Sequence, residues 1–253
     1  MMDHPKPKHR GYYLLPNMMT MASLLTGFLG ILWSIDGRFE MAAVAIIVSC
    51  VFDGLDGKLA RMTNSASDFG VQLDSLVDLV AFGVGPAVMI HQWCTHEFGR
   101  LGIMASFLVM ACGALRLARF NIQTGKISKR FFIGLPIPAA ACTLATFVLF
   151  SSYIPGTFVD WIPRITLGLA FLVSILMVSN VRYASFKDPE VIRAHRFSAT
   201  VTALLVFVLV ASEPKLLSFV FFIFYIISGL VYSYFILPLR GKSLLRESSH
   251  KIS

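Results

Sequence analysis

Long apolar runs separated by short polar segments fill most of this 253-residue chain. A helix needs about 17–25 predominantly apolar residues to cross the hydrocarbon core of a bilayer. We find eight such runs, the seventh being short and rich in valine: 15–35, 41–61, 70–92, 101–120, 133–152, 164–181, 198–212 and 216–236. The pattern predicts an all-α fold, a polytopic membrane bundle of about eight transmembrane helices.

Composition supports a membrane protein rather than a soluble domain. Of the residues, 56% are hydrophobic and only 14% are charged, and the mean hydropathy is +0.73. These values are typical of multi-spanning proteins. The first run has basic residues before it but no small-residue cleavage site after it, so we expect no removable signal peptide. We divide the chain into a basic N-terminus (1–14), one transmembrane domain (15–239) and a polar tail (240–253).

The positions of the basic residues predict how the chain is oriented. If eight helices cross the membrane with both termini inside, most lysines and arginines fall on the inner side, and the outer side has only Arg38, Arg100, Arg164 and Lys215. This is the asymmetry of the positive-inside rule. We therefore expect a protein of the cytoplasmic (inner) membrane. The net charge of +8 then indicates contact with anionic membrane lipids or a phosphate-bearing lipid substrate, not with nucleic acid.

Two acidic clusters interrupt the second and third runs near their predicted cytoplasmic ends. The first contains Asp53 and Asp56, and the second contains Asp74 and Asp78. Residues spaced by three or four share one face of a helix. The connection between the two runs is short, so the helices should be antiparallel neighbours with the two acidic faces opposed. Carboxylates at membrane depth are costly and need partners.

Bound metal ions are the simplest partners for these four carboxylates. Two divalent cations would neutralise them, and oxygen-only ligation suits Mg²⁺ or Mn²⁺ better than zinc. The guanidinium of Arg61 adds two parallel hydrogen-bond donors suited to phosphate. Gly57, Ala60 and Gly70 leave room for a bulky group. The set predicts phosphoryl transfer. The alternative from these residue types is an ion path, as in an ion-coupled membrane transporter.

The two clusters also form a recognisable motif. Asp-x-x-Asp-Gly-x-x-Ala-Arg, then eight residues, then Gly-x-x-x-Asp-x-x-x-Asp resembles the signature of the CDP-alcohol phosphotransferase family. Every fixed position of the signature is matched, by Asp53, Asp56, Gly57, Ala60, Arg61, Gly70, Asp74 and Asp78. A motif with this many fixed positions argues against the transporter alternative.

The resemblance implies an enzyme in which an alcohol hydroxyl displaces CMP from a CDP-linked lipid. It implies that two divalent ions are ligated by Asp53, Asp56 and Asp74, with Asp78 touching the metal site and acting as general base. The pocket for the nucleotide and diphosphate would be lined by Gly57, Ala60, Arg61 and Gly70. It further implies a core of six transmembrane helices, usually in a homodimer. Two helices here would be C-terminal additions to that core.

Four other stretches bear on the acceptor alcohol. Residues 15–20, 81–87, 116–121 and 134–140 resemble the phosphatidylserine synthase branch of the family. The substrates implied are CDP-diacylglycerol and L-serine, and the product would be phosphatidylserine. The runner-up is the same chemistry with another acceptor, glycerol 3-phosphate or inositol phosphate, whose phosphate should require more clustered arginine and lysine.

Four further polar residues are candidates for substrate contacts. Arg116 and Arg119 share a helix face at i, i+3 and could clamp the serine carboxylate or the lipid diphosphate. The plainer alternative is that they anchor the helix at the membrane surface by snorkelling. Asn17 and Thr20 are polar positions in the first run, and they either hydrogen-bond the nucleotide or satisfy a helix interface.

Overall fold

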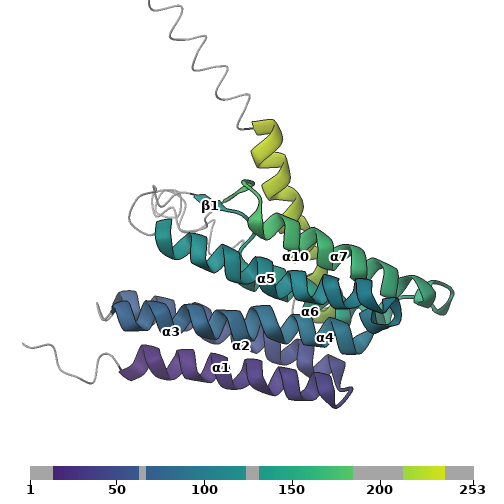
Figure 1. Ribbon diagram of the computed structural model, residues 1–253, viewed down its shortest axis with the longest axis horizontal. Coiled ribbons are helices and arrows are strands. Elements are labelled where there is room, and N and C mark those ends of the chain that lie inside the picture. The colour runs from purple at the N-terminus through teal and green to yellow at the C-terminus, as the bar shows by residue number, and fades with distance from the viewer. Residues whose placement is uncertain (1–13, 63–66, 124–130, 185–212, 237–253) are drawn as a thin grey trace, which may run out of the picture.

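A computed structural model describes residues 14–62, 67–123, 131–184 and 213–236. Helices dominate these segments (Figure 1). In chain order they are α1 (Leu14–Ile35), α2 (Phe39–Met62), α3 (Asp68–Asp78), α4 (Gly85–Trp93), α5 (Arg100–Gln123), α6 (Ile137–Phe150), α7 (Ile162–Val178) and α10 (Pro214–Val231). Short 3-10 turns cover Thr95–Phe98, Ser151–Tyr153 and Gly156–Trp161.

The described helices confirm an all-α polytopic membrane protein. Among the described residues, five stretches are long and apolar enough to cross a bilayer: Pro16–Ile35, Phe69–Trp93, Arg100–Ile122, Gly156–Val178 and Pro214–Tyr234. Helix α2 has 24 residues but carries the charged cluster, and α6 has only 14 residues. The predicted run at 198–212 lies outside the described residues, so the number of eight helices stays a prediction.

Helices α1 and α2 form a tightly packed hairpin. Their contact is polar at one point, where the Ser23 and Ser49 hydroxyls lie 2.8 Å apart and the Ser49 hydroxyl donates to the Ser23 carbonyl (2.9 Å). Gly27 allows α1 to approach the third helix closely, because a Cβ there would overlap Ala81. Small and hydroxyl residues are the usual means of close helix packing in a membrane.

The third predicted run is one continuous helix with a π-helical segment inside it. The segment spans Leu79–Val84, directly after Asp78, and joins α3 to α4. The Gly85 N–H bonds to the carbonyl of Val80, five residues back. The next residue, Pro86, has no N–H to give to the i−4 carbonyl. Such π-bulges are often found at functional sites.

A small two-stranded sheet pairs the segment before α6 with the segment after α7. Strands β1 (Phe131–Ile133) and β2 (Arg182–Ala184) pair antiparallel, with Phe132 opposite Tyr183. Gly134 turns the chain with φ of +80°, and a side chain there would overlap the Met177 carbonyl. The predicted fifth run, 133–152, therefore becomes helical only at Ile137, after the turn.

Helix α10 packs against this bundle through aromatic rings and an ion pair. The Phe219 ring stacks on Phe150 with centroids 5.0 Å apart. At the start of α10, Lys215 Nζ lies 2.9 Å from Glu40 Oε1 at the start of α2. In Figure 1, α10 crosses the other helices at an angle, and its C-terminal end lies near β1. These contacts hold α10 against the other described helices.

Candidate active site

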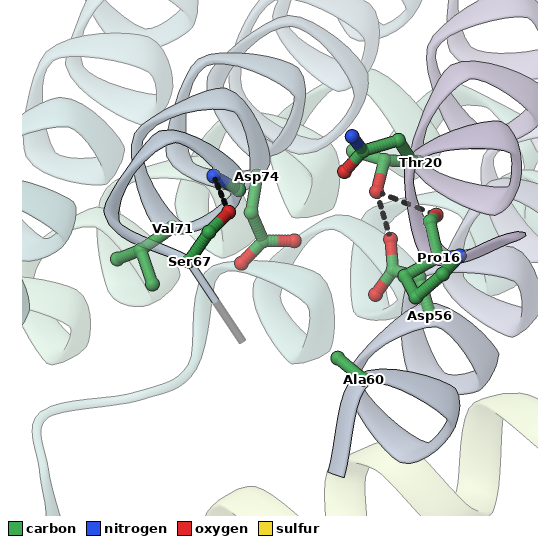
Figure 2. A pocket seen from close by; sticks show the side chains of 10 residues that line it. Pro16, Thr20, Asp56, Ala60, Ser67, Val71 and Asp74 are labelled. Carbon is green, nitrogen blue, oxygen red and sulfur yellow. Dashed lines mark hydrogen bonds between the residues drawn. The ribbon is translucent and has the colours of Figure 1, made fainter. Parts of the chain in front are cut away.

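The two acidic clusters meet where the C-terminal part of α2 faces α3. Asp53, Asp56 and Asp74 each place a carboxylate oxygen within 4.8 Å of the other two. Asp56 is only 5% exposed, and Figure 2 shows its carboxylate and that of Asp74 directed into the same space. Divalent ions hold oxygen ligands at about 2.0–2.6 Å, so ligands of one ion lie within about 5 Å of each other. The three aspartates therefore fit an oxygen-ligated divalent cation.

Thr20 of α1 holds one of these carboxylates. Its hydroxyl donates to Asp56 Oδ2 at 2.8 Å and also approaches the Pro16 carbonyl oxygen at 3.1 Å. Both Thr20 and Asp56 are buried, so the bond is shielded from water. The sequence left Thr20 open between the nucleotide and a helix interface. The structure places its hydroxyl across the α1–α2 interface, on a candidate metal ligand.

A pocket of about 140 Å³ opens beside the aspartates (Figure 2). All of the predicted nucleotide-site residues except Arg61 line it. The complete lining is Pro16, Asn17, Thr20, Asp56, Gly57, Ala60, Ser67, Gly70, Val71 and Asp74. The structure thus brings residues of α1, α2 and α3 to one place. Arg61 lies in the last turn of α2, and its side chain is outside the described part of the chain.

Ser67 belongs to this pocket and was missed by the sequence reasoning. It is the N-cap of α3, and its hydroxyl accepts a hydrogen bond from the Gly70 N–H at 3.1 Å. A Cβ at position 70 would come within 3.2 Å of the Ser67 oxygen, so glycine avoids crowding the cap. A serine directly before the start of a helix is a recognised N-cap signal and would have identified this residue.

Asp78 and Arg116 lie next to the cluster, deeper in the protein. They are 9% and 8% exposed. Arg116 comes from α5 and interacts electrostatically with Asp78 and Asp53, and its guanidinium carbon lies 5.9 Å from the centre of the Phe120 ring. Asp78 Oδ1 and Arg116 Nε have no hydrogen-bond partner among the described residues. Burial against carboxylates is not the environment of a snorkelling surface anchor.

Arg119 is placed differently from Arg116. Its guanidinium donates to the Ser179 and Val178 carbonyl oxygens at 3.2 and 3.1 Å. These carbonyls end α7, where a cation is favoured by the unpaired C=O groups and the helix dipole. The two arginines, which were predicted to act as one clamp, therefore have different partners. Arg116 faces the acidic cluster, and Arg119 fastens α5 to α7.

Comparison with known sequences identifies the family. The family model for CDP-alcohol phosphatidyltransferase matches residues 13–176, which include every residue of the acidic clusters and the pocket. The chain belongs to this family, and the resemblance seen in the aspartate motif is confirmed. Members of the family use divalent metals, in agreement with the cluster of three aspartates.

Several relatives match about two thirds of the chain. It is 42% identical over 178 residues to the CDP-diacylglycerol–serine O-phosphatidyltransferase of Helicobacter pylori, covering 69% of this chain and 73% of the relative. It is 34% identical over 173 residues to the Bacillus subtilis protein of the same name, covering 68% and 91%. The archaetidylserine synthase of Methanothermobacter thermautotrophicus is 37% identical over 181 residues, covering 70% and 72%.

Proposed function

We propose that this chain is an integral membrane CDP-diacylglycerol–serine O-phosphatidyltransferase, an enzyme that transfers the phosphatidyl group of CDP-diacylglycerol to the hydroxyl of L-serine. The products are CMP and phosphatidylserine. The observation that carries the proposal is the meeting of Asp53, Asp56 and Asp74 beside a pocket lined by the rest of the family motif. Relatives at 34–42% identity that are named for this reaction support serine as the acceptor.

The carboxylates of Asp53, Asp56 and Asp74, with Asp78 beside them, would hold two divalent ions, Mg²⁺ or Mn²⁺. When bound, such ions neutralise diphosphate charge and make the phosphorus more electrophilic. Thr20 fixes the orientation of the Asp56 carboxylate. Hydrogen bonds from neighbouring groups to metal ligands typically contribute strongly to metal affinity.

The residues of the pocket would hold the CDP part of the donor. Gly57, Ala60 and Gly70 expose backbone and leave room for the diphosphate, while Asn17 offers an amide to the nucleotide. Arg61, at the end of α2, would pair with phosphate oxygens. With the donor placed in this way, its diphosphate lies against the acidic cluster.

Asp78 is the proposed general base. Its buried Oδ1 has no hydrogen-bond partner among the described residues, so it is available to accept the proton of the serine hydroxyl. The serine oxygen forms a new bond to the lipid-linked phosphorus, and the bond from that phosphorus to CMP breaks. Arg116 would orient the acceptor through its carboxylate, or hold the donor diphosphate.

The proposed enzyme is a homodimer of the inner membrane, with both termini and the active site facing the cytoplasm. The distribution of lysine and arginine supports this orientation. The site lies at the ends of α1, α2 and α3 that are joined to the predicted cytoplasmic segments. The proposed catalytic domain is the single transmembrane domain 15–239.

The test is CMP release from CDP-diacylglycerol by the purified protein in detergent micelles. L-serine, glycerol 3-phosphate, inositol phosphate and no acceptor are compared, and the lipid product is identified by mass spectrometry. We expect CMP and phosphatidylserine in equal amounts with L-serine, and neither with the Asp74→Asn variant. Preferential use of a phosphorylated acceptor would contradict the proposed function.

A further inference from the structure

Arg116 has a second set of neighbours on the side of the C-terminal helix. Tyr225 of α10 interacts electrostatically with its guanidinium. Tyr183 of β2 packs on Tyr225, with ring centroids 5.4 Å apart and ring planes inclined by 32°. We refer to Arg116, Tyr183 and Tyr225 as the Arg–Tyr cluster. None of the three lines the pocket formed by α1, α2 and α3.

The cluster contains two buried polar atoms without a hydrogen-bond partner among the described residues. They are the Tyr183 hydroxyl and Arg116 Nε. Tyr183 is 0% exposed and Arg116 is 8% exposed. Buried donors are rarely left unpaired in proteins, because the cost of desolvation is then not offset. Arg116 Nε is a donor, and the Tyr183 hydroxyl can donate or accept. An acceptor of hydrogen bonds would therefore satisfy both atoms, and the guanidinium favours one with negative charge.

The position of the Tyr183 ring is fixed by the local structure. The residue pairs with Phe132 in the β1–β2 sheet, and its ring lies directly on Gly229 of α10, where a Cβ would overlap it. The strand pairing and Gly229 therefore hold the ring against α10 beside Tyr225. Tyr183 and Tyr225 also lie beyond residue 176, where the match to the family model ends.

We propose that Arg116 and the hydroxyls of Tyr183 and Tyr225 form a subsite for the carboxylate of the amino-acid acceptor. This inference rests on the proposed function, because it assigns the place of serine in that reaction. A guanidinium supplies positive charge and hydrogen-bond donors, and each of the two phenol hydroxyls can donate a further hydrogen bond, which together match what a carboxylate needs. Asp78 also interacts electrostatically with Arg116, so we place the hydroxyl of a serine bound in this subsite within the region of the proposed base.

The proposal gives the C-terminal helix a role in choosing the acceptor. The donor pocket is built from α1, α2 and α3, whereas the acceptor subsite needs α5, β2 and α10. Ethanolamine differs from serine by lacking the carboxylate, so it should gain nothing from the cluster. Substitutions in the cluster should therefore reduce the preference for serine over ethanolamine without affecting the use of CDP-diacylglycerol.

The experiment compares Tyr225→Phe and Tyr183→Phe with Tyr234→Phe, a matched control whose residue is 67% exposed in the π-helical segment Tyr232–Ile236 that follows α10. Each change removes one hydroxyl and keeps the ring. The KM values for L-serine and CDP-diacylglycerol, kcat, and the rate with ethanolamine are measured in detergent. We expect Tyr225→Phe and Tyr183→Phe to raise the KM for serine by about tenfold or more, as for loss of a hydrogen bond to a charged group. The other parameters and the control should stay at wild-type values.

The outcomes separate this inference from the proposed function. A wild-type protein that releases no CMP with serine overturns both. A wild-type enzyme active on serine, with both cluster variants matching Tyr234→Phe, overturns the carboxylate subsite and leaves the function standing. A rise in the KM for CDP-diacylglycerol in place of the KM for serine also overturns it, since the cluster would then hold the donor.

Discussion

Replacing Thr20 with valine tests how the α1 helix contributes to the metal site. Valine has nearly the same shape as threonine, so the buried packing of α1 on α2 should be kept. The change removes the hydroxyl that donates to Asp56 Oδ2 at 2.8 Å. The Asp56 carboxylate is then still present, but it loses the hydrogen bond that fixes its orientation.

The size of the effect follows from the kind of bond that is lost. A buried hydrogen bond to a charged group contributes about 1.5–3 kcal/mol, and each 1.4 kcal/mol corresponds to about a tenfold change in affinity. Groups that hydrogen-bond a metal ligand typically change metal affinity by about 10–100-fold when they are removed. We therefore expect Thr20→Val to need about 10–100 times more Mn²⁺ for half-maximal activity.

The assay is CMP release as a function of Mn²⁺ concentration, together with direct Mn²⁺ binding measured by electron paramagnetic resonance of the free ion. Saturating Mn²⁺ should restore most of the rate in Thr20→Val, and Thr20→Ser should behave like wild type because it keeps a hydroxyl. An unchanged Mn²⁺ dependence in Thr20→Val would refute the reasoning. If the KM for CDP-diacylglycerol rises instead, the hydroxyl serves the nucleotide.

Three other substitutions test single parts of the site. Asp78→Asn should still bind CDP-diacylglycerol but lose phosphatidyl transfer, because the proton of the serine hydroxyl then has no acceptor. Single-turnover rates and donor binding would show this. A near-normal kcat would exclude Asp78 as the general base. Arg116→Lys keeps the charge but loses the bidentate fork, so the KM for serine should rise by about 10–100-fold; an unchanged KM would argue against a serine contact. Arg119→Gln should lower the thermal unfolding temperature while leaving the KM for serine unchanged, because its bonds go to the end of α7; a selective rise in that KM would contradict this role.

The acidic site could be predicted from the sequence because it depends on local periodicity. Asp53 and Asp56 lie within one helix, Asp74 and Asp78 within the next, and a short connection makes the two helices neighbours. Helical spacing alone then brings the carboxylates together. The same reasoning placed Gly57, Ala60 and Gly70 in the pocket beside them, as the structure has it.

The roles of the arginines could not be separated in the same way. Arg116 and Arg119 share one face of α5, so their spacing suggests a single clamp. The end of α7 lies against Arg119 and takes up its guanidinium, whereas Arg116, one turn deeper, reaches Asp78. The difference arises from the packing of a helix that begins more than forty residues later in the sequence.

The β1–β2 sheet and the Arg–Tyr cluster depend on contacts between residues that are still further apart in the sequence. Nothing in the pattern near Tyr183 indicates that it pairs with Phe132 and packs on Gly229. Three-residue strands are too short to give an alternating signal. Gly134 was the available clue, since a glycine followed by Leu-Pro favours a turn over the start of a helix.

The most direct test of the central claim combines metal content with phosphatidylserine synthesis. The wild-type protein is treated with EDTA, dialysed and then titrated with Mn²⁺, while bound metal is measured by mass spectrometry and product by lipid analysis. We expect the stripped enzyme to be inactive, metal binding and phosphatidylserine formation to return together, and Asp74→Asn to recover neither. Phosphatidylserine formation at the full rate by metal-free wild-type protein would contradict this claim.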